Sequence, residues 1–119
     1  MVIVDTSIWV DHLRKGLPLL EKLLLNAEVV CHSFIIGELA CGDIKNRKEF
    51  LSLIQTLPMA PIIDLDEFIY FVDQNKLTGR GIGFIDIHLL ASARLSETPL
   101  WTLDKKLKSV AKELNIAYK

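Results

Sequence analysis

The chain has 119 residues, half of them hydrophobic, and a formal net charge of −1 at pH 7. This length suits one domain with a hydrophobic core that needs neither disulfides nor a structural metal. The composition excludes a disordered chain, and the near-zero charge excludes a nucleic-acid binder that depends on a globally basic surface. Any polyanion must therefore bind a local basic patch.

Several features bear on the compartment in which the protein works. Cys31 and Cys41 form no CxxC or Cys/His zinc pattern, so we expect two buried thiols of a cytosolic protein. No apolar run reaches the ~18–20 residues of a membrane span, and Asp5 interrupts the N-terminal apolar run too early for a signal peptide. We therefore expect a cytoplasmic protein that makes no use of a membrane.

Apolar runs and helical patterns alternate along the chain. In chain order, they predict a strand at 2–4, a helix at 7–15, a leucine-rich helix from Pro18, a strand at 28–31, a helix at 33–41 capped by Ser33 and a helix at 45–57. There follow an extended segment at 61–65, a helix from a cap at Asp66 to Leu77, a glycine loop at 79–83, a helix at 84–95, a strand at 100–103, a helix at 105–114 and a last strand at 116–118. Strands that alternate with helices predict an α/β fold with a parallel sheet covered on its faces. No repeat or linker divides residues 1–119, so we expect one domain.

The leucine-rich helix is apolar on more than one face. Its leucines are Leu17, Leu19, Leu20, Leu23, Leu24 and Leu25. A helix that is apolar nearly all round is either buried on both sides or covered by a partner. The mean hydropathy of +0.32, high for a small protein, favours the partner, because monomers seldom expose large apolar patches.

Four acidic residues occupy positions that an ordinary surface carboxylate does not explain. We call them the acid quartet: Asp5, Glu38, Asp86 and Asp104. Asp5 and Asp104 follow predicted strands, and functional side chains gather at the carboxyl ends of parallel strands. Glu38 and Asp86 have apolar neighbours at helical spacing, where an unpaired carboxylate is costly. Two helices can turn these two acids toward the crevice at the strand ends.

A converged quartet would need protons or a cation. Two carboxylates about 4 Å apart repel by roughly 4 kcal/mol at an effective dielectric of about 20. Oxygen ligands without His or Cys select Mg²⁺ or Mn²⁺ over zinc. The structural alternatives are that the acids accept hydrogen bonds from loops or pair with buried arginines, and that Asp104 is simply a helix cap.

Four stretches, each carrying one of these acids, resemble the PIN-domain family, and specifically the VapC-type toxins of bacterial and archaeal toxin–antitoxin pairs. They are VDTSIWVDHL, GELACG, FIDIHLLASA and LWTLDKKLKSVAKEL. The resemblance implies a three-layer α/β/α fold with a central, mainly parallel sheet and an acidic pocket that binds Mg²⁺ or Mn²⁺. It implies endoribonuclease activity, so that residues 1–119 would form a single PIN-like nuclease domain.

The resemblance also implies roles for individual residues. Asp5 and Asp86 would be the principal metal ligands, and Glu38 would complete the pocket directly or through water. Asp104 matches a fourth, more variable acid. Supporting hydroxyls are implied at Ser7 and Thr102, whereas Lys106 stands where many members carry a further acid.

The chemistry of such a site suggests a mechanism. The metal would polarise the scissile phosphate and lower the pKa of a bound water. Glu38 or Asp104 would orient that water or accept its proton, and in-line attack would leave a 5′-phosphate and a 3′-hydroxyl. A metal-free ribonuclease would instead need paired acid and base groups. The three histidines are poorly placed for that work: His12, His32 and His88.

RNA and protein partners follow from the same resemblance. Candidate RNA-binding residues are Arg80 in the glycine loop and Lys105, Lys106 and Lys108 after Asp104, although a lysine run on a surface helix is often only solvated. VapC-like proteins form homodimers and are silenced by a small antitoxin. We expect the apolar interfaces on the leucine-rich helix and on the segment Phe68–Val72.

Two rival hypotheses compete with the nuclease. Haloacid-dehalogenase-like phosphatases also end their first strand on an Asp, but they need a second Asp where this chain has Ser7. The stronger rival is an inactive PIN-like binding module that acts only through protein or RNA partners. A metal-dependent cleavage assay separates it from the enzyme.

Overall fold

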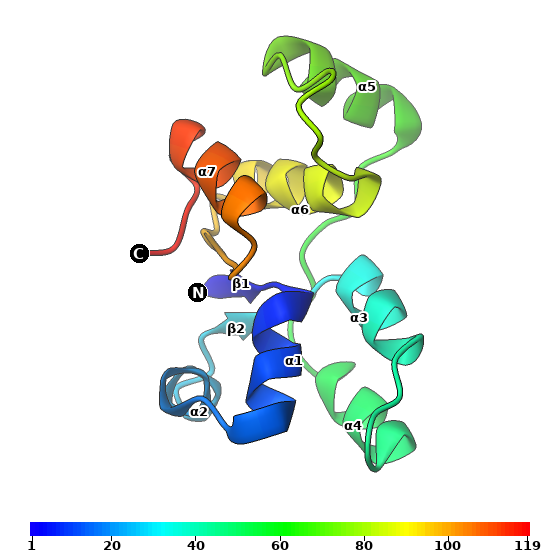
Figure 1. The fold of residues 1–119 in the computed structure, drawn as a ribbon, viewed down its shortest axis with the longest axis vertical. Helices are drawn as coiled ribbons and strands as arrows, with labels where there is room; N and C mark the ends of the chain where they lie inside the picture. The colour runs from blue at the N-terminus through cyan, green and yellow to red at the C-terminus, as the bar shows by residue number, and fades with distance from the viewer.

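The structure is a computed structural model that describes residues 1–119, and it contains a short sheet and seven helices (Figure 1). The strands are β1 (Val2–Val4), β2 (Val29–Val30) and β3 (Leu100–Trp101). The helices are α1 (Thr6–Lys15), α2 (Pro18–Leu25), α3 (Ser33–Ala40), α4 (Arg47–Ile54), α5 (Leu65–Gln74), α6 (Phe84–Leu95) and α7 (Lys105–Glu113). No helix has both the length and the apolar character needed to cross a bilayer.

The sheet is parallel throughout, with the strand order β2-β1-β3. Val2 lies opposite Val29, and Val4 lies opposite Trp101, so β1 is the central strand. Single parallel bridges extend the sheet at both edges, from Cys31 to Met59 and from Leu100 to Ala117. The segment predicted as a last strand at 116–118 therefore pairs at one position only.

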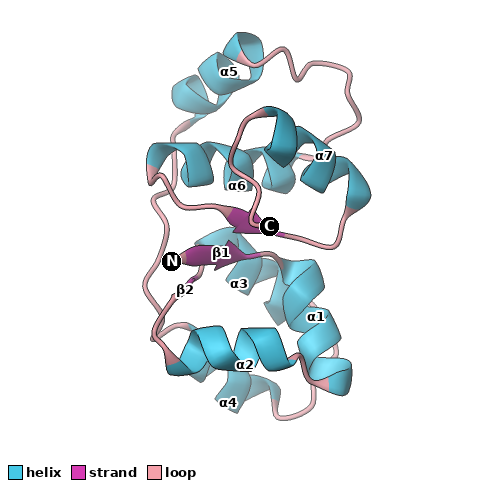
Figure 2. Ribbon diagram, turned by 90° about the vertical axis from the view of Figure 1, so that its left-hand side faces the viewer, coloured by secondary structure: helices cyan, strands magenta, loops and turns pink.

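Helices cover both faces of the sheet. Helices α1 to α4 lie on one side and α5 to α7 on the other, and Figure 2 shows the strands between the two layers. All three residues of β1 are buried, as expected for a central parallel strand covered twice. The predicted three-layer α/β/α fold with a parallel sheet is confirmed.

Helix α6 forms the centre of the second layer. Its predicted bounds are those observed, and its residues 87–93 are buried without interruption. A helix buried on nearly every side offers few places for a polar residue. Asp86 lies in its first turn, at the end that reaches the edge of the core.

Two predicted helix caps are wrong. Ser33 does not cap α3, because the Nδ1 atom of the preceding His32 accepts the Phe34 N–H at 3.0 Å. Asp66 does not cap α5, because Asp64 begins the helix with a reciprocal capping box to Glu67. An Asp with a Glu three residues later satisfies two free N–H groups at once.

The exposure of the two cysteines and of the leucine-rich helix agrees only in part with the prediction. Cys31 is buried as predicted, but Cys41 is exposed at the end of α3. The leucine-rich helix α2 buries Leu20 and leaves Leu19 45% and Leu25 87% exposed, so its apolar surface does extend beyond the core face. Helix α5 contains no buried residue.

Candidate active site

The carboxyl ends of β1 and β3 lie next to each other and present Asp5 and Thr102. The Asp5 N–H donates to the Trp101 carbonyl at 2.9 Å, which fixes the two strand ends together. The Thr102 and Ser7 hydroxyls donate to the same carboxylate oxygen of Asp5, Oδ2, at 2.7 and 2.8 Å. Asp5 is only 5% exposed, and its Oδ1 atom makes no hydrogen bond to the protein.

The same two hydroxyls hold the loop that leads to Asp104. The Leu103 N–H donates to Ser7 Oγ, and the Asp104 N–H donates to Thr102 Oγ1, both at 3.0 Å. Asp104 Oδ1 in turn accepts the Leu107 N–H at 3.0 Å, so this side chain caps α7. One oxygen of Asp104 is thus used by the helix, and Oδ2 is left free of protein hydrogen bonds.

Glu38 approaches from α3 and is bound by a hydroxyl that we did not predict. Thr6 Oγ1 donates to Glu38 Oε1 at 2.7 Å. Thr6 opens α1 directly after Asp5, so one short segment holds two members of the quartet. The sequence signal was present in the run Asp5, Thr6, Ser7, but both hydroxyls in such a run are more often helix caps.

Asp86 completes the group from the first turn of α6. Burial first, and then the charges of Asp5, Asp104 and Glu38, together raise its pKa from 3.8 to about 6. The structure therefore brings all four acids near enough to one another for their charges to act on Asp86. Two carboxylates in a shared crevice disfavour each other's ionised form.

No basic side chain neutralises the quartet. The three ion pairs in the structure join Asp11 to Arg14, Asp11 to Lys15, and Arg80 to Glu113. The alternative in which buried arginines pair with the acids is therefore wrong. The hydrogen-bond alternative holds in part, because Asp5, Glu38 and Asp104 each accept from hydroxyl or backbone donors through one oxygen.

The donor set fits a hard divalent cation, although the side chains do not form a closed cage. No three His, Cys, Asp or Glu side chains are grouped closely enough to hold a metal ion as they stand. The quartet offers carboxylate oxygens only, with free oxygens on Asp5 and Asp104 and no competing cation. Oxygen-rich sites of this kind suit Mg²⁺ or Mn²⁺.

Comparison with known proteins identifies the fold and the family. The model of the PIN domain matches residues 2–113. The chain belongs to the PIN-domain family. It is 42% identical over 118 residues to Ribonuclease VapC32 of two Mycobacterium tuberculosis strains, covering 98% of this chain and 95% of theirs. The expected VapC-type PIN relationship is thus confirmed.

A solved structure supports the fold independently. PAE2754 from Pyrobaculum aerophilum superposes with a TM-score of 0.66 and covers 98% of this chain and 87% of its own. Its sequence is only 17% identical to this PIN domain, so the likeness concerns the fold alone.

The basic residues predicted to bind RNA are not in contact with the quartet. Glu113 holds the Arg80 guanidinium through two hydrogen bonds of 2.7 and 3.1 Å and raises the pKa of Arg80. Lys106 Nζ lies over the glycine loop, 3.1 Å from the position that a Cβ of Gly81 would take. Lys105 and Lys108 are exposed on α7. Their role in RNA binding stays a prediction.

The histidines have structural surroundings, as expected. His12 Nδ1 accepts the Leu17 N–H, and His32 is fully buried with Nε2 3.0 Å from Ser92 Oγ. His88 is 4% exposed, its Nδ1 has no partner, and aromatic rings surround it. No hydrogen bond joins any of them to the quartet.

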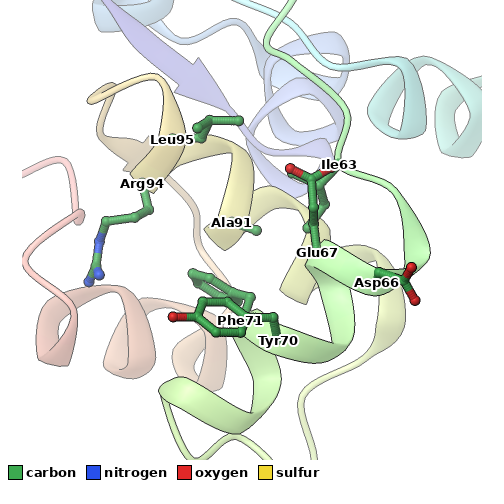
Figure 3. Close-up of a pocket in the computed structure, with 8 residues that line it drawn as sticks. All are labelled: Ile63, Asp66, Glu67, Tyr70, Phe71, Ala91, Arg94 and Leu95. Carbon is green, nitrogen blue, oxygen red and sulfur yellow. The ribbon is translucent and has the colours of Figure 1, made fainter.

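A separate pocket of about 410 Å³ lies between α5 and α6, as Figure 3 shows. Its lining residues are Ile63, Asp66, Glu67, Tyr70, Phe71, Ala91, Arg94 and Leu95. None of them belongs to the acid quartet, and none is a predicted site residue. Tyr70 and Phe71 do belong to the segment Phe68–Val72 that we expect at an interface.

Proposed function

We propose that residues 1–119 form a single PIN-like nuclease domain that acts as the toxin of a toxin–antitoxin pair. The reaction is Mg²⁺- or Mn²⁺-dependent hydrolysis of RNA phosphodiesters, leaving a 5′-phosphate and a 3′-hydroxyl. Family membership and the identity to Ribonuclease VapC32 support the ribonuclease class. The observation that carries the proposal is the acid quartet, four carboxylates without a basic partner, in which burial and the charges of the other three raise the pKa of Asp86.

Within this proposal each acid has a distinct role. Asp5 and Asp86 would be the principal metal ligands, and Glu38 would complete the pocket directly or through water. Ser7 and Thr102 fix the Asp5 carboxylate through Oδ2, so that Oδ1 would be available to hold the cation. Thr6 orients Glu38 in the same way through Oε1.

The bound cation supplies polarisation of the scissile phosphate and activation of a water molecule. The chain's own contribution is to orient that water and accept its proton. Glu38 and Asp104 are the candidates, because each keeps one oxygen free of protein hydrogen bonds. Thr6 holds Glu38 through Oε1, and the Leu107 N–H holds Asp104 through Oδ1, so both acids remain candidates for this role.

The decisive experiment compares Asp86→Asn with Asp11→Asn on an RNA substrate. Asp86→Asn should abolish Mg²⁺-dependent cleavage while the protein stays folded, and chelation of the metal should silence the wild type. Asp11→Asn changes an acid outside the quartet that is already paired with Arg14 and Lys15, so cleavage should be nearly unchanged. Undiminished cleavage by Asp86→Asn would exclude the site. Ligation to the new RNA ends reports whether they carry a 5′-phosphate.

The proposal includes partners and compartment. The substrate would be RNA, and the inhibitor would be an antitoxin protein. The protein would act as a homodimer in the cytoplasm and would not use a membrane. The exposed leucines of α2 and the segment Phe68–Val72 are the proposed apolar interfaces. Light scattering on the purified protein, alone and with the product of the neighbouring gene, tests both contacts.

One observation favours the alternative of an inactive PIN-like binding module. No three acidic or metal-binding side chains are grouped closely enough to hold a metal as they stand. That alternative predicts no Mg²⁺- or Mn²⁺-dependent cleavage by the wild type and no difference between wild type and Asp86→Asn in metal binding.

A further inference from the structure

An exposed aromatic residue lies next to the acid quartet. Phe84 opens α6 two residues before Asp86 and remains 57% exposed. Its ring centroid lies 4.9 Å from that of Phe68 and 4.6 Å from that of His88. Phe34 lies 6.2 Å away with its ring inclined by only 27°. These neighbours support Phe84 from inside the molecule and leave more than half of it open to solvent.

A pocket of about 300 Å³ lies in front of this cluster, between α3 and the start of α6. We call it the aromatic pocket, and its lining residues are Ser33, Phe34, Gly37, Glu38, Cys41, Phe84 and Ile85. Glu38 belongs both to this pocket and to the acid quartet. A ligand that reaches from one to the other would therefore place an apolar planar group in the pocket and, with the cation of the proposed function bound at the acids, an anionic group beside that cation.

We propose that the aromatic pocket holds one unpaired nucleobase of the RNA substrate, stacked on Phe84 beside the phosphate to be cut. The inference rests on the proposed nuclease function and adds a residue that positions the substrate. Bases stack on exposed aromatic side chains with little regard to sequence. A base inside a duplex is already stacked, so the pocket selects an unpaired nucleotide in a loop, bulge or single strand.

Features of the pocket favour a nucleobase over other occupants. Its lining holds no basic side chain, and its one carboxylate, Glu38, would repel a phosphate that entered without a cation. A second protein chain needs an interface of about 800 Å² per partner, far more than a pocket of this size supplies. An uncharged planar group suits the rings, and the phosphate attached to it would be held by the cation that the proposed function places at the acids.

Cys41 provides a direct measure of whether the pocket is filled. Its thiol is exposed and lines the pocket, whereas Cys31 is fully buried and out of reach of an alkylating reagent. The alkylation rate of Cys41 is measured with Mg²⁺ and either adenosine 5′-monophosphate or ribose 5-phosphate. These probes differ only in the base and contain no phosphodiester to cleave. We expect adenosine 5′-monophosphate to protect Cys41 and ribose 5-phosphate to protect it far less.

Variants of Phe84 separate stacking from simple apolar contact. Phe84→Leu keeps an apolar side chain but loses the ring, and we expect the adenosine 5′-monophosphate concentration for half-protection to rise by roughly tenfold. Phe84→Tyr retains a ring, so adenosine 5′-monophosphate should protect Cys41 in this variant as it does in the wild type. Tyr118→Leu is the control, because Tyr118 is an aromatic residue near the C-terminus, outside the aromatic pocket, the acid quartet and the proposed apolar interfaces.

Three results would overturn the inference. They are equal protection by the two probes, wild-type protection in Phe84→Leu, and a change of oligomeric state in Phe84→Leu by light scattering. The last would make this surface a contact between copies of the chain. Cleavage of a single-stranded RNA by the same preparations separates the two proposals. If the wild type cuts RNA and adenosine 5′-monophosphate still protects Cys41 normally in Phe84→Leu, the stacking proposal is refuted and the nuclease proposal stands.

Discussion

The hydroxyls around Asp5 show how single residues prepare a charged site. Oδ2 of this buried carboxylate accepts from Ser7 and Thr102, and each of these hydroxyl oxygens in turn accepts a backbone N–H of the loop before α7. A buried carboxylate is tolerated only when its charge is compensated by hydrogen bonds or by a counter-ion. Two donors on one oxygen leave the other oxygen as the natural place for the counter-ion.

Removal of one hydroxyl tests this arrangement. Thr102→Val keeps the shape of the side chain but removes the 2.7 Å bond to Asp5 and the acceptor of the Asp104 N–H. We expect a loss of about 1–3 kcal/mol in the free energy of unfolding, measured with urea, and a large drop in RNA cleavage. Thr98→Val is the control, because the Thr98 hydroxyl is bonded to the Ser96 carbonyl, away from the acids. Equal effects of the two variants on cleavage would contradict the role of Thr102.

Asp86 gives a prediction with a definite sign in pH. Its pKa is raised from 3.8 to about 6 in the fold, so the folded protein holds this proton more tightly than the unfolded chain. The resulting stabilisation is present at low pH and is lost as pH rises through 6. Without metal, Asp86→Asn should therefore be more stable than wild type by about 1 kcal/mol at pH 7.5, and no more stable at pH 4.

Urea unfolding in the presence of a chelator measures this difference, with Asp11→Asn as a variant that should show almost none. Added Mg²⁺ should stabilise the wild type and leave Asp86→Asn nearly unchanged, because ligand binding to the folded state adds to stability. A difference between the variants that does not depend on pH would show that ionisation of the half-buried Asp86 carboxyl is not its source.

At the scale of elements, the positions of the helices could be predicted from the sequence more accurately than their first residues. The apolar pattern predicted α6 to the residue, since a long helix with uniform burial leaves little freedom in its bounds. Ser33 and Asp66 failed as caps because His32 and Asp64 had competing acceptors, and only the backbone angles decide between neighbouring candidates. Helix α4 begins at Arg47, after Asn46 in a left-handed conformation with φ 54°, later than its pattern suggested.

The first turn of α7 carries a prediction about RNA affinity. Lys105, Lys106 and Lys108 are exposed directly after Asp104, whereas Glu113 already holds Arg80. Replacement of the three lysines by Gln should lower RNA affinity and flatten its dependence on salt, by about 0.7 in the logarithmic slope for each lost phosphate contact on a single strand.

The measurement is a salt titration of RNA binding in the cleavage-deficient Asp86→Asn protein. The matched control replaces three exposed lysines elsewhere, Lys22 in α2, Lys48 in α4 and Lys76 just after α5. If both sets of lysines change the slope equally, the three lysines on α7 make no specific contact with RNA and are only solvated surface residues.

At the scale of the whole molecule, the fold explains why acids about a hundred residues apart could be associated from the sequence. Asp5 and Asp104 follow strands, and neighbouring parallel strands bring their ends together whatever lies between them. The hydroxyl of Thr6, the exposure of Cys41 and the ring cluster around Phe84 were not predictable. All three depend on how α3 is turned toward its neighbours, because α3 carries Glu38 and Phe34 and ends at Cys41. The sequence period of a helix of only two turns does not fix that orientation.

His32 connects several layers and makes the whole fold sensitive to acid. Its Nδ1 accepts the Phe34 N–H, so Nε2 carries the proton and donates to Ser92 Oγ, which donates to the Pro61 carbonyl at 2.6 Å. Burial lowers the pKa of His32 from 6.5 to about 4, and the charge of His88 acts in the same direction. The unfolded chain therefore binds the proton more readily, and stability falls as pH drops from 6.5 to 4, by up to about 3 kcal/mol.

Asp86 changes stability in the opposite direction over much of the same pH range, so the effect of His32 is best measured in Asp86→Asn protein. In that background the free energy of unfolding should decrease between pH 6.5 and 4.5, and His32→Asn should remove most of the decrease while lowering stability at pH 7. Ser92→Ala removes the partner of Nε2 but keeps the titrating ring, so its stability should be lower but its pH dependence retained. The imidazole proton resonances of His32 give a second readout, since they should stay in the neutral form until about pH 4. An His32 ring that titrates near pH 6.5 in the folded protein would contradict the connection between its burial and the acid sensitivity of the fold.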